Sequence, residues 1–515
     1  METEPRVTLP VGILGVGVAV PSLRIDAAEI ARAWSASARG SLAVPDADED
    51  TLTLAWAASL MALDAAGVRP DQLDGLFWGT TRPPLAEGPS HVFLATALGI
   101  DRRAGGHLSS GSTHSGMDAL VSAWDALGAG HVRTALVVAS DALVPGPGSA
   151  VETTTGAGAA AYVLGPVAGA PGMLAYRTTD SLPVVDRYRG DGAFATSDTY
   201  DGRLFRDKVF MPLVSRVAAE LCRAPGADGG TGPHDWSIAD PDGRLAPALA
   251  RSIGANLISA EVTGSLGDTG APAAFLGAMT AMTAPGSFAM VAYGGGRATA
   301  VLAGSTREVP GARGALALLG APAHTASYPQ LLRSRAQLVS SGDPVPMGVP
   351  PGSAAFVRGN LEMLCLRGAR CEDCGYISTP PSIHPSCAGC GGDRMTIVDL
   401  ARAGTVETFV VNETMPPPFT APLPLAVIDL DDGARVMLQG VSEDAPDLAI
   451  GDRVQLVLRR YGVERGIPVY GYKAARPPHQ AGVAPSPHQT DAARPPHQAG
   501  VAPSLRQARN RGGSR

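Results

Sequence analysis

The stretch CEDCGYISTPPSIHPSCAGC, residues 371–390, says most about how this chain folds. It holds four of the six cysteines as two Cys-x-x-Cys pairs with twelve residues between them. Each pair can direct two thiolates at one ion, and a segment of this length lets both pairs close a tetrahedral site. The spacing therefore predicts a four-cysteine zinc site held by Cys371, Cys374, Cys387 and Cys390. A disulfide pair and a vestigial site are the alternatives.

A four-thiolate site leaves no open coordination position, so the predicted zinc is structural and stabilises a subdomain too small to hold itself together. The other two cysteines, Cys222 and Cys365, stand alone in the sequence. Cys222 lies on the apolar face of the helical pattern VSRVAAELC, which is typical of a buried, unreactive thiol.

Downstream of the cysteines the composition changes to short β-branched and aromatic stretches with turn residues between them. Predicted strands are Thr405–Val411, Leu425–Asp429, Arg435–Leu438 and Arg453–Leu458. They indicate a small β-barrel or sandwich. After Lys473 the sequence AARPPHQAGVAPS occurs at 474–486 and again at 492–504, and this Pro- and Ala-rich tail is predicted to be disordered.

Upstream of a Pro- and Gly-rich linker at 347–359, strand and helix patterns alternate over residues 9–345. The predicted strands are Leu9–Val20, Gly75–Gly79, Ala135–Ala139, a stretch near Ile258–Thr263 and Phe288–Tyr293. The predicted helices are Asp26–Trp34, Thr51–Ala66, Asp118–Leu127, Leu245–Ile253 and Ala271–Met282. This alternation predicts an α/β domain with a mainly parallel sheet layered with helices.

The composition excludes several classes of protein. With 515 residues, 45% hydrophobic and 17% charged, the chain is long enough for several globular domains. A net charge of −7 gives no overall attraction to nucleic acid. The N-terminus lacks the basic region of a signal peptide, and the apolar stretches are too short or too Gly-broken to span a bilayer. We expect a cytoplasmic protein with neither nucleic-acid nor membrane partners.

The cysteine stretch and the strands after it, CEDCG…CAGCGG…GTVETFVV…PLAVIDLDDGARVMLQG, resemble the acyl-CoA-associated zinc-ribbon/OB-fold family over roughly 355–475. The first 345 residues resemble the thiolase superfamily, closest to the 3-hydroxy-3-methylglutaryl-CoA synthase type and its ketoacyl synthase III relatives. The resemblance is carried by VGILGVGVAVPSLRI, WGTTRPPLAEGPSHVFLATALG, STHSGMDAL, ALVVASDA, TTGAGAAAYVL, GDTGAPAAFLGAM and VAYGGGRATAVL.

These resemblances imply an αβαβα thiolase-like domain over 1–345, a linker and zinc ribbon over 346–400, an OB-type barrel over 401–475 and a tail over 476–515. They also imply an acyl thioester of coenzyme A or of an acyl-carrier protein as substrate, with the ribbon/OB domain helping to bind its pantetheine or nucleotide end. The thiolase fold normally dimerises, so a homodimer is expected. A partner thiolase or hydratase is a further implication.

The four positions at which the resemblance places catalytic residues have all changed. Thr113 stands where the nucleophilic Cys belongs, Ala239 where the His belongs and Asp268 where the Asn belongs. Thr81 stands in place of the synthase's acid/base Glu. Because a Thr hydroxyl without a base is a poor nucleophile, the ordinary Claisen reaction through a Cys acyl-enzyme is not expected.

Three hypotheses remain open. An aldol or retro-aldol enzyme would make or break a C–C bond without a covalent intermediate, with His114 or Asp268 as base and Tyr293 as acid. An acyltransferase would carry the acyl group on Thr113 or Ser112 with His114 as base. An inactive domain would bind acyl-CoA as a scaffold for a partner synthase.

Each candidate residue also has a purely structural interpretation. His114 could bond a backbone carbonyl, Asp268 could cap a helix starting at Thr269–Gly270, and Tyr293 could simply pack in the core. Thr113 could only fill the space of the lost nucleophile. Gly294, Gly295 and Gly296 suit the close approach of an acyl group, but they suit a tight turn nearly as well.

Overall fold

The computed structural model describes residues 10–166, 170–198, 201–224, 232–338, 360–414, 421–464 and 466–477. The described residues up to Arg476 form one compact unit. Within these ranges no helix combines the length and the apolar character that crossing a membrane requires. The predicted linker at 347–359 and the predicted tail from residue 478 onward lie outside the described residues.

A ten-stranded sheet organises the N-terminal part, in the order β12-β11-β13-β14-β8-β1-β7-β6-β4-β5. It consists of two five-strand halves with the same pairing pattern, joined where β1 pairs with β8. One half contains β1 (Val11–Ala19), β4 (Gly75–Thr80), β5 (Gly105–Ser110), β6 (Ala135–Ala142) and β7 (Ala157–Pro166). The other contains β8 (Gly172–Ser181), β11 (Asp235–Ile238), β12 (Asn256–Leu257), β13 (Gly286–Gly294) and β14 (Arg297–Ser305).

The prediction of a mainly parallel sheet was wrong. In each half three strands are parallel, β5-β4-β6 and β12-β11-β13, and the remaining strands pair antiparallel. Parallel neighbours need a long crossover connection, whereas antiparallel neighbours can be joined by a tight turn. Only Gly295 and Gly296 separate β13 from β14, which forces an antiparallel hairpin.

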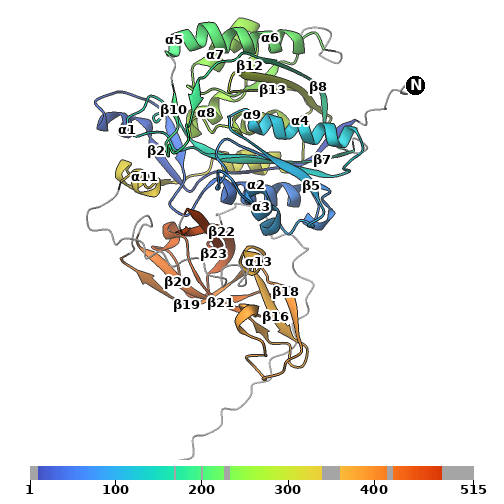
Figure 1. The fold of residues 1–515 in the computed structure, drawn as a ribbon, viewed down its shortest axis with the longest axis vertical. Helices are drawn as coiled ribbons and strands as arrows, with labels where there is room; N and C mark the ends of the chain where they lie inside the picture. The colour runs from blue at the N-terminus through green and yellow to red at the C-terminus, as the bar shows by residue number, and fades with distance from the viewer. Residues whose placement is uncertain are drawn as a thin grey trace, which may run out of the picture. The chain divides into compact units, whose positions relative to one another are not determined.

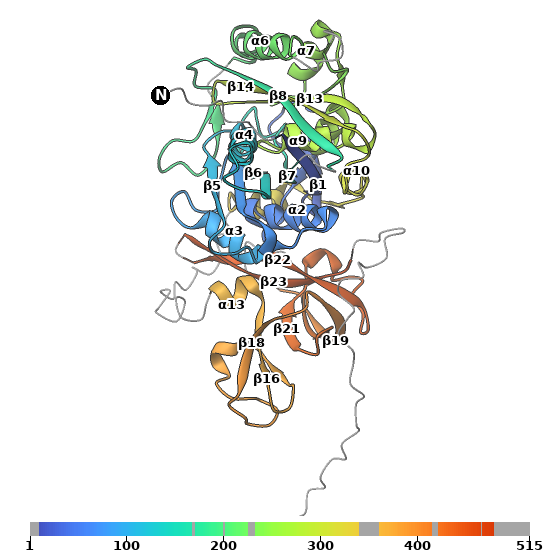
Figure 2. The ribbon, with the colours of Figure 1, turned by 90° about the vertical axis from the view of Figure 1, so that its right-hand side faces the viewer.

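Helices form three layers around the two halves of the sheet, as Figures 1 and 2 show. Helices α4 (Ser115–Gly128) and α9 (Ala273–Ala278) lie in the middle layer. Helices α2 (Thr51–Ala66) and α3 (Ser90–Leu98) lie on one outer side, and α6 (Met211–Leu221) and α7 (Leu245–Ile253) on the other. This arrangement is the αβαβα layering that the sequence predicts.

The remaining elements of this part are short. A three-stranded sheet has the order β15-β2-β3, with β2 (Leu23–Asp26), β3 (Ser41–Val44) and β15 (His324–Thr325). Strands β9 (Arg187–Tyr188) and β10 (Ser197–Asp198) pair with each other. The further helices are α1 (Ala27–Ala33), α5 (Gly202–Phe205), α8 (Ala260–Leu266), α10 (Ala312–Leu319) and α11 (Tyr328–Ser334).

Local chemistry explains the helices whose bounds were predicted well. Helix α2 begins after Asp50, whose side chain accepts the backbone N–H groups of Leu52 and Thr53. It ends at Gly67, whose φ of 64° is the left-handed conformation that glycine adopts without strain. Both ends agree with the predicted helix.

Three predicted elements needed correction. The strand expected near Ile258–Thr263 is mostly helix α8, because Val262 and Leu266 place buried side chains four residues apart. The helix expected at Ala271–Met282 is shorter: α9 ends at Ala278, and a separate 3₁₀ turn follows at Ala281–Thr283. The helix expected from Asp118 begins already at Ser115.

The C-terminal part contains a three-stranded ribbon and a five-stranded sheet. The ribbon has the order β17-β16-β18, with β16 (Arg367–Cys371), β17 (Ile377–Ser378) and β18 (Met395–Asp399), and it follows helix α13 (Asn360–Cys365). The larger sheet has the order β21-β20-β19-β22-β23, with β19 (Ala403–Asn412), β20 (Leu423–Leu430), β21 (Arg435–Gln439), β22 (Arg453–Glu464) and β23 (Ile467–Ala475). Strand β23 was not predicted, and it includes Ala474 and Ala475, the first two residues of the repeat that was predicted to be disordered.

Charged residues of β22 and β23 contact an acidic loop, residues 45–50, between β3 and α2. The ammonium group of Lys473, which is fully buried, lies 2.8 Å from a carboxylate oxygen of Asp48. The Arg459 guanidinium lies 3.3 Å from the Glu49 carboxylate. The Tyr470 hydroxyl donates to Asp50 at 2.7 Å. These contacts fasten the C-terminal sheet to the turn that begins α2.

Candidate functional site

A cavity of about 630 Å³ lies at one end of the N-terminal sheet. Its wall is formed by residues 37–42, which lead into β3, by Thr153 and Thr154, and by segments within 240–247 and 257–268. Two buried carboxylates line it, those of Asp240 and Asp268, together with two exposed cationic side chains, Arg39 and Arg244. Asp242 lines it as well, so the wall carries charged groups of both signs.

Asp268 is held by an ion pair and by its own turn. It is 5% exposed, and one carboxylate oxygen lies 2.8 Å from Nη1 of Arg187. The other oxygen accepts the N–H of Gly270 at 2.9 Å. Helix α9 begins only at Ala273, so this last bond closes a turn before the helix rather than capping a helix that starts at Thr269–Gly270.

Asp240 follows strand β11 and lies next to Ala239, the position at which the resemblance places a His. Its carboxylate accepts the backbone N–H groups of Gly243 at 2.9 Å and of Ala246 at 3.0 Å. Burial, opposed by the bond from Ala246 and reinforced by the nearby charge of Asp242, raises the pKa of Asp240 to about 7.

Tyr293 lies near the end of β13 with 5% of its surface exposed. Its hydroxyl donates to the Asp186 carboxylate at 2.6 Å, and Asp186 is itself buried. The next residue, Arg187, holds Asp268. One short segment therefore contacts two residues that the sequence singled out.

Thr113 lies in the turn before α4 and is half-buried. Its hydroxyl donates to the backbone carbonyl of Tyr293 at 2.9 Å. A Cβ atom on Gly294 would lie 2.4 Å from the Thr113 hydroxyl and 2.5 Å from the His114 nitrogen. The absence of a side chain at Gly294 therefore allows β13 to pack against this turn.

His114 points into the protein core and is 1% exposed. Its Nε2 lies 2.8 Å from the Thr299 hydroxyl, and its Nδ1 lies 3.1 Å from an Asp118 carboxylate oxygen. Burial opposes ionisation of Asp118, but the hydrogen bond and charge of His114, together with Arg297, lower the pKa of Asp118. Both ring nitrogens therefore have neighbours within the domain, and His114 does not line the cavity.

Gly295 and Gly296 form the turn between β13 and β14 with φ angles of 56° and 71°. A Cβ on Gly296 would lie 2.1 Å from the Leu182 carbonyl oxygen, so this residue also makes a close backbone contact. The turn geometry of both glycines and the close contact of Gly296 therefore explain these two residues without a bound acyl group.

Thr81, at the position of the synthase Glu, donates its hydroxyl to Asp141 at 2.6 Å. Asp141 is fully buried and also accepts the N–H of Ala271 at 2.7 Å. Burial raises the pKa of Asp141 to about 6, although the bonds from Thr81, Ala271 and Thr80 oppose this. Asp141 thus links the end of β4 to the turn that carries Asp268.

Four residues of this region are not predicted by the sequence motifs: Asp141, Asp186, Arg187 and Asp240. Asp141 could have been recognised from the apolar stretch ALVVASDA, because a carboxylate in a core strand is buried and a buried charge needs partners. Asp240 stands next to Ala239 in IADPDG, where the expected His is missing. Asp186 and Arg187 gave no local sign, since their partners lie about 80 or more residues away.

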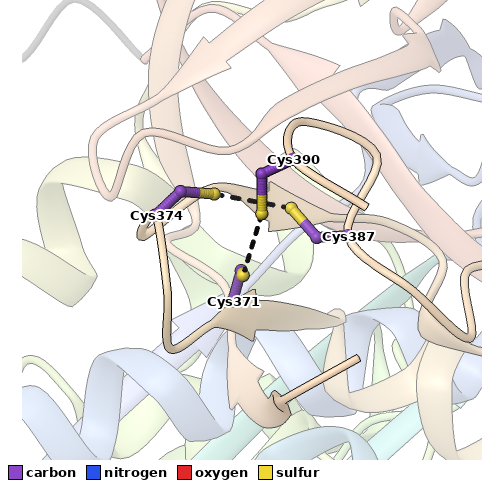
Figure 3. A group of neighbouring side chains, drawn as sticks. All are labelled: Cys371, Cys374, Cys387 and Cys390. Carbon is purple, nitrogen blue, oxygen red and sulfur yellow. Dashed lines mark hydrogen bonds between the residues drawn. The ribbon is translucent and has the colours of Figure 1, made fainter. Parts of the chain in front are cut away.

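The four ribbon cysteines converge on one point, as Figure 3 shows. Their sulfur atoms all lie within 4.8 Å of one another, with 3.7 Å between Cys371 and Cys390 and 3.5 Å between Cys374 and Cys387. Four sulfurs around zinc at about 2.3 Å would be about 3.8 Å apart, so the donor set fits a tetrahedral zinc ion. All six cysteines of the chain are free thiols in the structure, so no disulfide is formed among them.

Comparison with known proteins defines the class of the two parts. The family model of the ChsH2 C-terminal OB-fold domain matches residues 397–459. The N-terminal part has the thiolase-like fold of solved condensing enzymes and homologues among the hydroxymethylglutaryl-CoA synthases. The chain therefore joins a thiolase-like domain to a C-terminal OB-fold domain.

Among the relatives are hydroxymethylglutaryl-CoA synthases. Those of Caldivirga maquilingensis and Thermococcus gammatolerans are each 34% identical to the chain, over 165 and 158 residues, which is 30% of this chain and 47% and 45% of those proteins. The synthase of Methanocella arvoryzae is 27% identical over 260 residues, 48% of this chain and 72% of that protein. The match thus spans about half the length of the first two relatives.

Solved structures show the same fold at lower identity. MvaS in complex with 3-hydroxy-3-methylglutaryl coenzyme A has a TM-score of 0.55 at 20% identity, covering 66% of this chain and 95% of its own. The priming β-ketosynthase of the R1128 polyketide pathway has a TM-score of 0.53 at 21% identity, covering 60% of this chain and all of its own.

Proposed function

We propose that this protein binds an acyl thioester of coenzyme A or of a carrier protein in the cavity and makes or breaks a C–C bond next to the thioester carbonyl. The observation that carries the proposal is the pair of buried carboxylates, Asp240 and Asp268, on the wall of one cavity in a thiolase-like fold. Arg39 and Arg244 on the same wall suit the phosphates of such a substrate.

An aldol or retro-aldol reaction without an acyl-enzyme fits the contacts better than covalent catalysis. The Thr113 hydroxyl donates to a backbone carbonyl, and His114 is turned toward Thr299 and Asp118. Among the described residues these contacts orient no base toward Thr113, whereas enolate chemistry needs only a carboxylate base and a stabilised oxyanion. In this proposal Asp268 stays paired with Arg187, and Tyr293 bonds Asp186, the residue before Arg187.

Mass spectrometry with a panel of acyl-CoA and β-hydroxyacyl-CoA thioesters tests the proposal. We expect condensation or cleavage products without a covalent adduct. An acyl adduct on Thr113 or Ser112 would instead show an acyltransferase. Tight binding with neither adduct nor product would favour the scaffold hypothesis.

We further propose that Cys371, Cys374, Cys387 and Cys390 hold a structural zinc ion. Zinc bound to four thiolates would have no position for substrate, so it would close the ribbon rather than take part in the reaction. We also propose domain boundaries at residues 345, 400 and 475. A cytoplasmic location and a partner thiolase or hydratase are part of the same proposal.

The proposed homodimer is supported by β5, one of the two edge strands of the large sheet. Its residues are largely exposed, and among the described residues it pairs only with β4. An edge strand presents unpaired N–H and C=O groups to a second copy. Light scattering should give twice the chain mass of 52.4 kDa, and a monomer would contradict this proposal.

A further inference from the structure

We propose that Asp240 is the base that takes the α-proton from the bound acyl thioester. The inference deepens the proposed function, on which it rests, by naming the group that starts the reaction. It is carried by the place of Asp240 on the cavity wall, beside Ala239, and by the contacts of its carboxylate.

Asp240 reaches this place because β11 ends at Ile238, and the chain then turns along the cavity before α7 begins at Leu245. Ala239 contributes only a methyl group where the resemblance places an imidazole. The Asp240 carboxylate is the buried ionisable group that this segment contributes to the cavity wall. It is 3% exposed, so water screens it little.

The hydrogen bonds of Asp240 hold its carboxylate in place. Its two oxygens accept the backbone N–H groups of Asp242, Gly243, Leu245 and Ala246, which belong to the turn before α7 and to the first two residues of that helix. These bonds fix the side chain without placing a cation against it. Arg187, the cation that neutralises the other buried carboxylate of the cavity, binds Asp268 instead.

The two carboxylates of the cavity consequently have different environments. Asp268 has an ion-pair partner, whereas the pKa of Asp240 is raised by burial and by the neighbouring Asp242. A base works best when its pKa lies near the pH at which it operates. Asp240 meets this condition near neutral pH.

In the proposed step one Asp240 oxygen takes the proton from the carbon next to the thioester carbonyl. The C–H bond breaks, an O–H bond forms, and the electron pair moves through the carbon onto the carbonyl oxygen as an enolate. The enolate then attacks a carbonyl carbon and the resulting alkoxide takes the proton from Asp240, or the enolate carbon takes the proton back. In the retro-aldol direction the Asp240 carboxylate takes the proton of the β-hydroxyl as the C–C bond breaks, and the protonated Asp240 then gives it to the enolate carbon.

The alternative is that Asp240 only caps α7. Asn also accepts backbone N–H groups at a helix start, so Asp240→Asn keeps much of the capping but removes the base. Asp240→Glu keeps a base with a longer reach. Asp242→Asn is the matched variant: it removes a neighbouring carboxylate of the same cavity while leaving Asp240 in place.

The experiment measures exchange of α-protons for deuterium in D₂O, with acetyl-CoA and butanoyl-CoA as probes, because this half-reaction needs no second substrate. Thermal unfolding and thioester binding are measured for each variant. We expect Asp240→Asn to lower the exchange rate about 100-fold or more while binding changes less than about threefold. Asp240→Glu should recover part of the rate.

The pH dependence of α-proton exchange distinguishes a catalytic base at Asp240 from a residue that only caps α7. Wild-type exchange should rise with pH as Asp240 ionises, and Asp242→Asn should move this rise to lower pH because a neighbouring negative charge is lost. Equal exchange by wild type and Asp240→Asn would overturn the role of Asp240 and leave the proposed function intact. No exchange by wild type with either probe would overturn both.

Discussion

Arg187 and Asp268 form the buried ion pair that holds one side of the cavity, with side chains 10% and 5% exposed. Breaking a buried pair by removing one partner leaves a charge in a poorly solvated place. We expect Arg187→Met to lower the free energy of unfolding by about 3 kcal/mol, measured by urea denaturation. Arg69→Met removes the exposed pair with Asp71 and should leave the free energy of unfolding nearly unchanged, because water screens both groups. Equal losses in the two variants would contradict this prediction.

Gly294 shows how closely β13 packs on the turn before α4. Gly294→Ala should destabilise the protein by about 2 kcal/mol, because its Cβ would overlap Thr113 and His114. Adding Thr113→Ala should not restore stability, since the His114 backbone nitrogen remains 2.5 Å away. Gly190→Ala is the control, because a Cβ there meets nothing within 4 Å. Thermal unfolding of wild type, Gly294→Ala, the double variant and Gly190→Ala tests this. Full rescue by Thr113→Ala would contradict the prediction, because the backbone at His114 would then have moved to make room for the Cβ.

The sequence could point to Asp268, Tyr293 and Thr113 because family motifs surround them, and the structure places them in neighbouring segments. It could not assign their partners. Asp186 contacts Tyr293 across 107 residues of sequence, and Arg187 contacts Asp268 across 81. Such pairings depend on how β8, β13 and their connecting loops come together, which no local pattern records.

At the scale of single elements, the ribbon offers the clearest test. Protein prepared under reducing conditions should contain about one zinc per chain by elemental analysis, and Cys387→Ser should bind much less and unfold at lower temperature. Cys222→Ser is the matched control, because Cys222 lies outside the cluster and its thiol has its pKa raised by burial. Full zinc content in Cys387→Ser would refute the site.

Elements with a defined start and stop were predictable. Asp50 and Gly67 bound α2, and Asp26 caps α1 by accepting the Ala28 N–H. The segment near Ile258 misled because its β-branched residues favour a strand in isolation, while packing of Val262 and Leu266 on one face makes it a helix. In this segment tertiary packing, rather than local propensity, determines the secondary structure.

For the whole molecule, the acidic loop should make stability depend on pH. Burial raises the pKa of Glu49 to about 7, with Glu443 and Asp48 adding to this and Arg459 opposing it. Burial likewise raises the pKa of Asp46 to about 6. A raised pKa means that the folded state holds its proton more tightly than the unfolded state, so this stability is present at low pH and is lost as pH rises through about 6 to 7.

Unfolding free energies measured by urea from pH 5 to pH 8 test this. The free energy of unfolding of wild type should fall over this pH range. In Glu49→Gln this fall should be smaller by an amount on the order of 3 kcal/mol. Asp141 and Asp240 titrate in the same direction and remain in both proteins, so the difference between the two curves isolates Glu49. Asp71→Asn, at an exposed pair, should leave the slope unchanged. A Glu49→Gln curve parallel to wild type would reject the prediction.

The acidic loop also follows β3, and Ser41 and Leu42 of that strand line the cavity. Lys473, Arg459 and Tyr470 belong to the same chain as the loop they contact, so their local concentration around it is of the order of millimolar whatever the protein concentration. Dilution therefore should not separate these strands from the acidic loop. If the two parts were produced as separate polypeptides, this contact would depend on the concentration of each.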